Sequence, residues 1–478
     1  MKRTDAQNGL AWLAAGALVL ATCAIITLLS REFVYGESHA ERPVLAVLAA
    51  YYLGWIGFAA AAFLVYRSQS GSLRWILTVG ILGRIILLPS NLVLENDCYR
   101  YVLDGETVKH GVNPYRWAPD EVEARAPEAF RRELATDRAQ LVLSRVGYPE
   151  IPTIYPPLAQ GAFAVGAAIA PWNWMGQRIV FLAVDFATQL VLLGLLRAIG
   201  RPSGWVVLYA WNPLILKEIA NSAHVDALVA LFLAVCLFGL LGAVQSRGSA
   251  SWSALAGAAL AAAVLGKLYP AIIAPVCCLY LIAAAPGYTA ASSFLAAFFG
   301  TFVLGYLPFW GVGLEQLTAG LRIYISEWQR NAGAFALMNA MVPWPRVAAA
   351  GIALTTMALA SMAAFRARGN FGRLVAAVQW TYLAWFLFLP AAYPWYAIGL
   401  IAVSVVRPRL WVVVLSGAFG LYYLHFWIDY HEFPATWHAW TALIEHGAVW
   451  TSLAVATCCR AYGRCAELTQ NRWADDDR

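Results

Sequence analysis

Acidic and basic side chains follow one another at helical spacing just after a long apolar run, in the segment 96–115. Arg100 stands about one helical turn from both Asp97 and Asp104, so a helix would place all three on one face. A carboxylate at the end of a membrane span lies at headgroup depth, where Asp97 could accept a proton from an attacking hydroxyl. Asp97 is therefore the candidate catalytic base. The spacing leaves a second interpretation equally open, which is a salt-bridged helix start at a membrane exit.

A dense polar set between two apolar runs, in the range 212–226, forms the second candidate region. It contains Lys217, Glu218, Asn221, His224 and Asp226. Such groups are costly near lipid, so their presence indicates a substrate or headgroup site. His224 and Asp226 could hold a metal as a pair, but contacts to a headgroup or an acceptor are the favoured interpretation.

Cations and aromatic rings at the ends of other apolar runs extend this set. Lys267 either snorkels to the interface or offsets phosphate charge, and Arg322 and Arg330 suit bidentate phosphate binding. Tyr155 and Tyr393 stand beside prolines. They are either substrate contacts or members of an aromatic belt at the membrane interface. The candidate substrate contacts are Arg100, Tyr101, Asp104, Asn113, Tyr115, Tyr155, Lys217, Glu218, His224, Asp226, Lys267, Tyr269, Arg322, Arg330 and Tyr393.

Cofactors are not expected from the sequence, although a divalent metal stays an alternative. His425, Asp429 and His438 stand in an aromatic stretch, and their spacing fits no standard metal motif. No Gly-x-Gly-x-x-Gly or Walker A pattern occurs, so no nucleotide-binding domain is expected. Asp185 lies inside an apolar run and should pair within the bundle, and Arg84 is the kind of partner that it needs.

Composition places these residues on a membrane protein. Of the 478 residues, 61% are hydrophobic and 13% are charged, whereas a soluble domain has about a quarter charged residues. Apolar runs such as 10–29, 44–65, 227–244 and 294–310 are long enough to cross about 30 Å of hydrocarbon. The formal net charge of +6 fits a positive-inside bias and not nucleic-acid binding. The sequence predicts an all-α, polytopic transmembrane bundle.

Short arginine-rich loops, such as 67–74, 197–201 and 366–373, should face the cytoplasm. With both termini on that side, the path contains about 14 spans, and the short run 158–170 is either a full span or a half-spanning helix. The predicted parts are N-terminal transmembrane helices (1–94), a helical outer-face catalytic loop after the third span (95–156), a transmembrane bundle with substrate-binding outer loops (157–458) and a cytoplasmic tail (459–478).

In this order, the motifs resemble the membrane glycosyltransferases of the GT-C superfamily. The likeness includes polyprenyl-phosphomannose-dependent mannosyltransferases of bacteria and the catalytic subunit of GPI mannosyltransferase I. It is carried by Asp97–Tyr115, Ile154–Leu158, Asn212–Asp226, Lys267–Pro270 and Tyr393–Tyr396. The resemblance implies a catalytic base in an early outer loop, which is Asp97 here. In the commoner layout this loop follows the first apolar run and not the third, and the chain also lacks a tight D-x-D.

The resemblance implies a hexosyltransferase, in particular a mannosyltransferase, of the bacterial inner membrane with its site on the periplasmic face. Nucleotide sugars are absent there, so the donor would be a polyprenyl-phosphate sugar and the acceptor a glycan or lipid. Phosphate is a good leaving group, so cations and a base suffice for inverting displacement. The competing functions are a flippase or transporter for lipid-linked sugars and an O-antigen-type polymerase. Nucleic-acid partners are not expected, and the sugar, acceptor, isoprenoid length and oligomeric state stay open.

Overall fold

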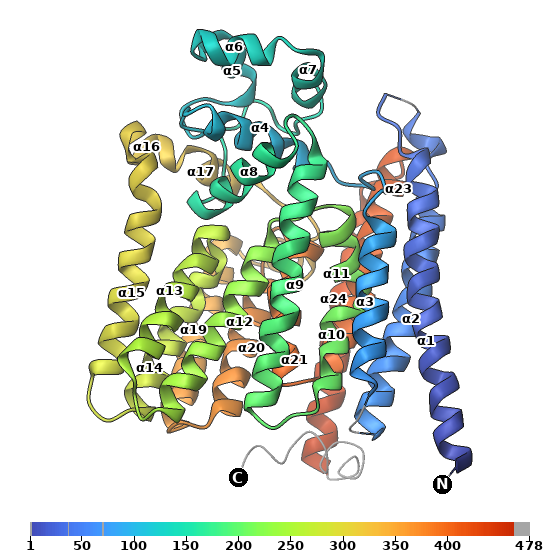
Figure 1. The fold of residues 1–478 in the computed structure, drawn as a ribbon, viewed down its shortest axis with the longest axis vertical. Coiled ribbons are helices and arrows are strands. Elements are labelled where there is room, and N and C mark those ends of the chain that lie inside the picture. The colour runs from blue at the N-terminus through green and yellow to red at the C-terminus, as the bar shows by residue number, and fades with distance from the viewer. Residues whose placement is uncertain (1, 37, 69–70, 463–478) are drawn as a thin grey trace.

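A helical bundle carries a layer of shorter helices at one end, which we call the cap (Figure 1). The computed structural model describes residues 2–36, 38–68 and 71–462. Within these ranges the regular elements are helices, and one isolated β-bridge joins Arg330 to Ala391. The prediction of an all-α fold is confirmed. Residues 463–478 of the predicted cytoplasmic tail lie outside the described residues.

Membrane-length helices make up the bundle. In the described part of the chain, seven segments are long and apolar enough to span: Gly9–Glu32, His39–Ser68, Trp174–Ala198, Asp226–Gln245, Thr289–Leu317, Pro345–Arg366 and Leu410–Tyr430. Four shorter apolar helices accompany them: Pro157–Ile169, Ala250–Gly266, Tyr269–Ala284 and Pro394–Val406. These helices fit a membrane protein, while the larger number of about 14 spans stays a prediction.

The bundle helices run between the cap and the opposite end of the molecule. They are α1 (Lys2–Leu29), α2 (Val44–Ser68), α3 (Leu73–Leu87), α9 (Trp174–Ala198), α12 (Asp226–Gln245), α13 (Ala250–Gly266), α14 (Ala274–Ala284), α15 (Thr289–Tyr306), α19 (Pro345–Arg366), α20 (Phe371–Leu387), α21 (Ile398–Val406), α22 (Leu410–Ala418) and α24 (Thr436–Tyr462). Helix α1 begins and helix α24 ends at the end of the bundle away from the cap (Figure 1).

The cap is built from α4 (Asp97–Lys109), α5 (Pro119–Arg125), α6 (Glu128–Leu134), α7 (Asp137–Leu143) and α8 (Pro157–Ile169). It has its own small apolar core, which includes Leu103 and Phe130. Helices α4 and α8 pack closely, because a Cβ atom at Gly105 would lie 2.3 Å from the carbonyl oxygen of Phe163. Only glycine fits this contact, which fixes α4 against α8.

Further short segments complete the capped end of the bundle. They are α16 (Gly313–Leu317), α17 (Ala319–Glu327), α18 (Gly333–Met341), η7 (Pro394–Ala397), η8 (Phe419–Tyr423) and α23 (Leu424–Tyr430). The segment between α9 and α12 is broken into η3 (Ser203–Val206), α10 (Val207–Ala210), α11 (Pro213–Ile215) and the π-helix η4 (Leu216–Asn221). A π-helix occurs often at functional sites, and η4 carries part of the second candidate region.

A buried ion pair ties three of the bundle segments together. Arg84 of α3 and Asp185 of α9 form a salt bridge with side chains that are 1% and 0% exposed. Arg84 also donates to the carbonyl oxygens of Gly80 and Ala210, at 2.9 and 2.8 Å. The predicted pairing of Asp185 within the bundle is confirmed, with Arg84 as its partner.

Candidate functional site

A cavity of about 380 Å³ lies where the cap meets the bundle, and we call it the Asp97 cavity. Cap residues line one side of it and the ends of bundle helices line the other. Its charged residues are Glu95, Asp97, Arg100, Lys267, Arg330 and Asp429, and its aromatic residues are Tyr148, Tyr155, Tyr324, Trp328, Tyr393, Trp395, Tyr396, Tyr422 and Phe426. The cavity therefore joins segments that are far apart in the sequence.

Two buried side chains hold the loop that leads into Asp97. The Asn221 side chain accepts from the backbone N–H of Val93 at 3.1 Å and donates to the carbonyl oxygen of Asn91 at 2.7 Å. Arg178 donates to the carbonyl oxygen of Ser90 at 2.6 Å and also to that of Asn221. Because these bonds pair the polar backbone groups of the loop before α4, the bundle fixes the position of Asp97 at the start of α4.

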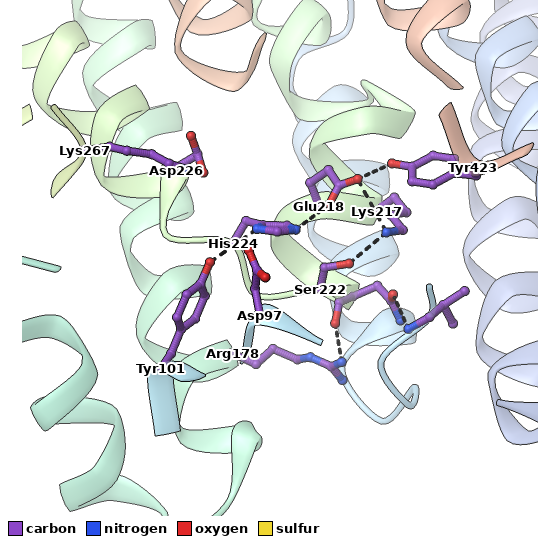
Figure 2. Close-up of polar contacts among 12 residues, drawn as sticks. Asp97, Tyr101, Arg178, Lys217, Glu218, Ser222, His224, Asp226, Lys267 and Tyr423 are labelled. Carbon is purple, nitrogen blue, oxygen red and sulfur yellow. Dashed lines mark hydrogen bonds and ion pairs between the residues drawn. The ribbon is translucent and has the colours of Figure 1, made fainter. Parts of the chain in front are cut away.

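The carboxylate of Asp97 is half-buried and has few partners. The hydroxyl of Tyr155 donates to Asp97 Oδ2 over 3.3 Å, which is a long bond. In the described parts of the chain Asp97 forms no salt bridge. Figure 2 shows its carboxylate on the side of α4 that faces His224. Its remaining acceptor capacity leaves Asp97 suited to take a proton from a hydroxyl group.

Asp104, two helical turns further along α4, has a different environment. Its Oδ2 accepts from Thr153 Oγ1 at 2.6 Å and from Gln160 Nε2 at 3.0 Å, and the residue is 4% exposed. Burial raises the pKa of Asp104, while the charge of Arg100 and these two hydrogen bonds act in the opposite direction. Asp104 thus ties α4 to the chain before α8.

Arg100 is also engaged by the protein itself. Its guanidinium donates to the carbonyl oxygens of Ile151, Gly147 and Tyr148, at 2.9, 3.1 and 2.8 Å. It lines the Asp97 cavity but forms no ion pair with either aspartate of α4 among the described residues. The salt-bridged helix start that the spacing allowed is therefore absent there, and Arg100 orders the loop at 147–151.

Lys267 reaches the Asp97 cavity from the end of α13. Its Nζ lies 2.6 Å from Asp226 Oδ2 and 4.3 Å from the centre of the Tyr396 ring. The Tyr269 hydroxyl donates to the other oxygen of Asp226 over 3.3 Å. Because Asp226 is fully buried and Lys267 is not, the pair presents its cationic end to the cavity.

A second set of charges lies behind the cavity wall, around η4 (Figure 2). Glu218 Oε1 lies 3.4 Å from Lys217 Nζ, and Glu218 Oε2 lies 3.0 Å from His224 Nε2. Tyr423 also donates to Glu218, and the other ring nitrogen of His224 is 3.4 Å from the Tyr101 hydroxyl. No group of three potential metal ligands occurs among the described residues. This cluster supports the wall rather than lining it.

The other predicted contacts divide between the cavity and its surroundings. Arg330 lines the cavity and pairs with Asp429 at 2.5 Å. Tyr393 lines it too and accepts from Trp328 Nε1 at 3.1 Å. Arg322 is exposed, lies outside the lining and donates to the carbonyl oxygen of Glu315 at 3.0 Å. Direct contact between Arg322 and a bound phosphate is thus not favoured by its position.

Asn113 and Tyr115 connect the cap to neighbouring segments. Asn113 Nδ2 donates to the carbonyl oxygen of Phe309 at 2.9 Å, and the Tyr115 hydroxyl donates to that of Tyr155 at 2.7 Å. Neither residue lines the Asp97 cavity. Tyr115 holds the backbone of Tyr155, whose hydroxyl bonds Asp97, and Asn113 accepts from the backbone N–H of Tyr115 at 3.1 Å, so their geometry is that of positioning residues.

Several cavity residues were not selected from the sequence. They include Glu95, which stands two positions before Asp97, and the aromatic residues Tyr324 and Trp328. Burial raises the pKa of Glu95 well above its usual range, with the charge of Lys217 opposing the shift. The signal that could have found Glu95 is its place beside the candidate base in an otherwise apolar stretch.

Comparisons with known proteins supply one match. The family model described as "Alpha-(1->6)-mannopyranosyltransferase, N-terminal domain" matches residues 7–284. This range includes α4, η4, Lys267 and the whole cap. No curated protein and no solved structure matches the chain.

Proposed function

Because the chain belongs to the alpha-(1->6)-mannopyranosyltransferase family, we propose that it transfers mannose from polyprenyl-phosphate mannose to a glycan acceptor on the outer face of the membrane. Membership makes the protein a glycosyltransferase and implies a sugar donor and a glycan acceptor. The lipid donor, the face and the residue roles are the proposal. One observation carries it: a sparsely bonded carboxylate, Asp97, shares a cavity with Lys267 and Arg330.

The reaction follows from this arrangement. Asp97 accepts the proton of the acceptor hydroxyl while that oxygen attacks the anomeric carbon of the donor. The bond between this carbon and the phosphate oxygen breaks, and the polyprenyl phosphate leaves with the electron pair. A single displacement inverts the anomeric centre, so an alpha-linked product requires a beta-linked donor. Asp97 later returns the proton to solvent.

Lys267 and Arg330 supply positive charge for the leaving phosphate. Each is held by a carboxylate, Asp226 for Lys267 and Asp429 for Arg330, so their positions are set before the donor binds. Fixed charges that need no reorganisation stabilise a developing anion most effectively. Apolar surface between the bundle helices is the place for the polyprenyl chain.

The distribution of arginines supports an outer-face site. Arg67 and Arg74 flank the connection between α2 and α3, and Arg366 and Arg373 flank that between α19 and α20. The helix ends that carry these arginines lie at the end of the bundle away from the cap (Figure 1). Short basic loops stay on the cytoplasmic side, so the cap and the Asp97 cavity would face outward. Nucleotide sugars are not available there.

The identity of the sugar donor is the test of the proposal. Purified protein in vesicles would be given an alpha-(1->6)-linked oligomannoside together with radiolabelled mannose, either as polyprenyl-phosphate mannose or as GDP-mannose. We expect an alpha-(1->6)-extended product from the lipid donor alone. Extension from GDP-mannose alone would contradict the lipid donor, and movement of labelled lipid across the bilayer without any extended product would favour the flippase alternative.

A further inference from the structure

A second cavity, of about 440 Å³, adjoins the Asp97 cavity, and we call it the Tyr35 cavity. Its lining is Phe33, Val34, Tyr35, His39, Arg42, Asn91, Leu92, Leu94, Glu95, Asn96, Tyr99, Arg145, Trp174, Phe426 and Tyr430. Glu95, Asn96 and Phe426 line both cavities. The volume falls within the range of about 300–1,000 Å³ that is usual for ligand sites. The proposed reaction assigns no role to this space.

Aromatic rings and guanidinium groups alternate along its wall. The Arg145 guanidinium lies 4.7 Å from the centre of the Tyr35 ring and 5.4 Å from that of Tyr99. The Arg42 guanidinium likewise lies 5.9 Å from the centre of the Phe33 ring and 5.6 Å from that of Tyr430. Stacking of this kind holds flat groups rigidly, and it builds a preorganised surface.

Polar atoms in this wall lack partners. Arg42 Nε and Glu95 Oε1 are buried and have no hydrogen-bond partner in the described parts of the chain. An unsatisfied buried polar atom destabilises the fold, so a ligand group that bonds it gains binding free energy. Asn91 and Asn96 add two carboxamides to the lining. One unpartnered donor and one unpartnered acceptor thus belong to residues that line the same cavity.

The mixture of groups fits a sugar better than an anion. A phosphate site is built from donors, yet the lining residues include the acid Glu95 and two asparagines, Asn91 and Asn96, whose side chains carry acceptors as well as donors. Arg145 donates to the Tyr99 hydroxyl at 2.8 Å, and Arg42 donates to the Tyr430 hydroxyl at 3.2 Å and to the carbonyl oxygen of Val34 at 2.8 Å. Sugar hydroxyls both donate and accept, and the apolar face of a pyranose packs on aromatic rings.

We propose that the Tyr35 cavity binds the terminal mannose of the acceptor glycan and delivers its hydroxyl to Asp97. This inference rests on the proposed function. Glu95 and Asn96 lie on both cavities and directly precede Asp97, so a sugar in contact with them lies beside the candidate base. The donor occupies the Asp97 cavity and the acceptor the Tyr35 cavity, and the two substrates meet at the start of α4.

Tyr35→Ala tests this assignment with little risk to folding, because Tyr35 is 48% exposed. We expect the KM for an alpha-(1->6)-linked oligomannoside to rise at least tenfold, with the KM for the lipid donor unchanged. Tyr35→Phe keeps the ring and should stay within twofold of wild type. The matched control is Tyr288→Ala, because Tyr288 is 74% exposed and lies between α14 and α15 at the opposite end of the bundle.

A binding measurement makes the test independent of the donor. Saturation-transfer NMR with the oligomannoside alone should show binding to wild type and to Tyr288→Ala, and a tenfold weaker signal for Tyr35→Ala. Binding that depends on Tyr35 in a protein without transfer from the lipid donor would refute the proposed donor and retain the glycan site. Equal binding by both tyrosine variants would overturn the inference, as would a raised KM for the lipid donor, which would identify a phosphate site.

Discussion

Asp97 and Asp104 lie on one face of α4 and show how differently two carboxylates of one helix can be used. Asp104 is buried and accepts short hydrogen bonds from Thr153 and Gln160. Asp97 lies in a cavity and accepts one long bond from Tyr155. A buried carboxylate that accepts two hydrogen bonds from the protein holds the fold, whereas one with free acceptor capacity can take part in a reaction. The availability of the oxygen atoms separates these two roles.

Asp97→Asn should have the largest effect. Asparagine keeps the shape of the side chain but does not accept the proton, so we expect kcat to fall about 10²–10⁴-fold. Affinity for the lipid donor and the apparent melting temperature should match wild type. Steady-state kinetics in reconstituted vesicles measure the fall, and an unchanged kcat would remove Asp97 from the chemistry.

Asp185→Ala extends the comparison to a carboxylate with a fully buried partner. Removal of Asp185 leaves the charge of Arg84 buried and unpaired, which costs about 3–5 kcal/mol of folding free energy. The apparent melting temperature in detergent should fall by several degrees. The double variant Arg84→Met with Asp185→Leu removes both charges and should recover most of the loss. Similar stability of Asp185→Ala and wild type would contradict a structural pair.

Asp104→Ala should have a moderate effect, and Asp104→Asn a small one. Alanine leaves the hydroxyl of Thr153 and the amide of Gln160 without their shared acceptor, which costs about 1–3 kcal/mol. The side-chain oxygen of asparagine can accept both bonds, so transfer activity should persist in Asp104→Asn. Loss of kcat in Asp104→Asn at normal stability would place Asp104 in the chemistry and erase the contrast with Asp97.

The pH dependence of stability gives a finer test of Asp104. Burial raises its folded-state pKa above the ordinary value of 3.8, so the folded protein holds this proton more tightly than the unfolded chain. The proton bound to Asp104 stabilises the folded protein fully at pH values below that ordinary value. This stabilisation is lost as the pH rises through the folded-state pKa. As the pH rises from about 4, the melting temperature of wild type should therefore fall relative to that of Asp104→Asn. Parallel curves for the two proteins would refute the raised pKa.

Arg322→Gln should have the smallest effect. Arg322 is exposed, and its guanidinium donates to the carbonyl oxygen of Glu315. Stability should stay within about 0.5 kcal/mol of wild type, and the KM for the lipid donor should not change. A raised donor KM in this variant would return Arg322 to the phosphate-binding group, where its residue type alone had placed it.

The sequence by itself determined the helical membrane bundle, because runs of apolar residues have one stable arrangement in lipid. It also singled out Asp97 and Lys267 as candidate site residues and predicted a partner for Asp185, because charged groups beside or within such runs are energetically costly. Tyr155 and Arg330, two of the predicted substrate contacts, line the Asp97 cavity. These conclusions depend on local sequence and on the membrane as a solvent.

Only the tertiary structure decided what each of these side chains is free to do. Thr153 lies 49 positions from Asp104, so no local pattern could show that Asp104 is satisfied and Asp97 is not. The Tyr35 cavity likewise depends on Arg42 and Arg145, which the fold brings to one wall from separate segments. Hydrogen bonding and desolvation act over a few ångströms in space, and the residues that supply them are set by packing of the whole chain.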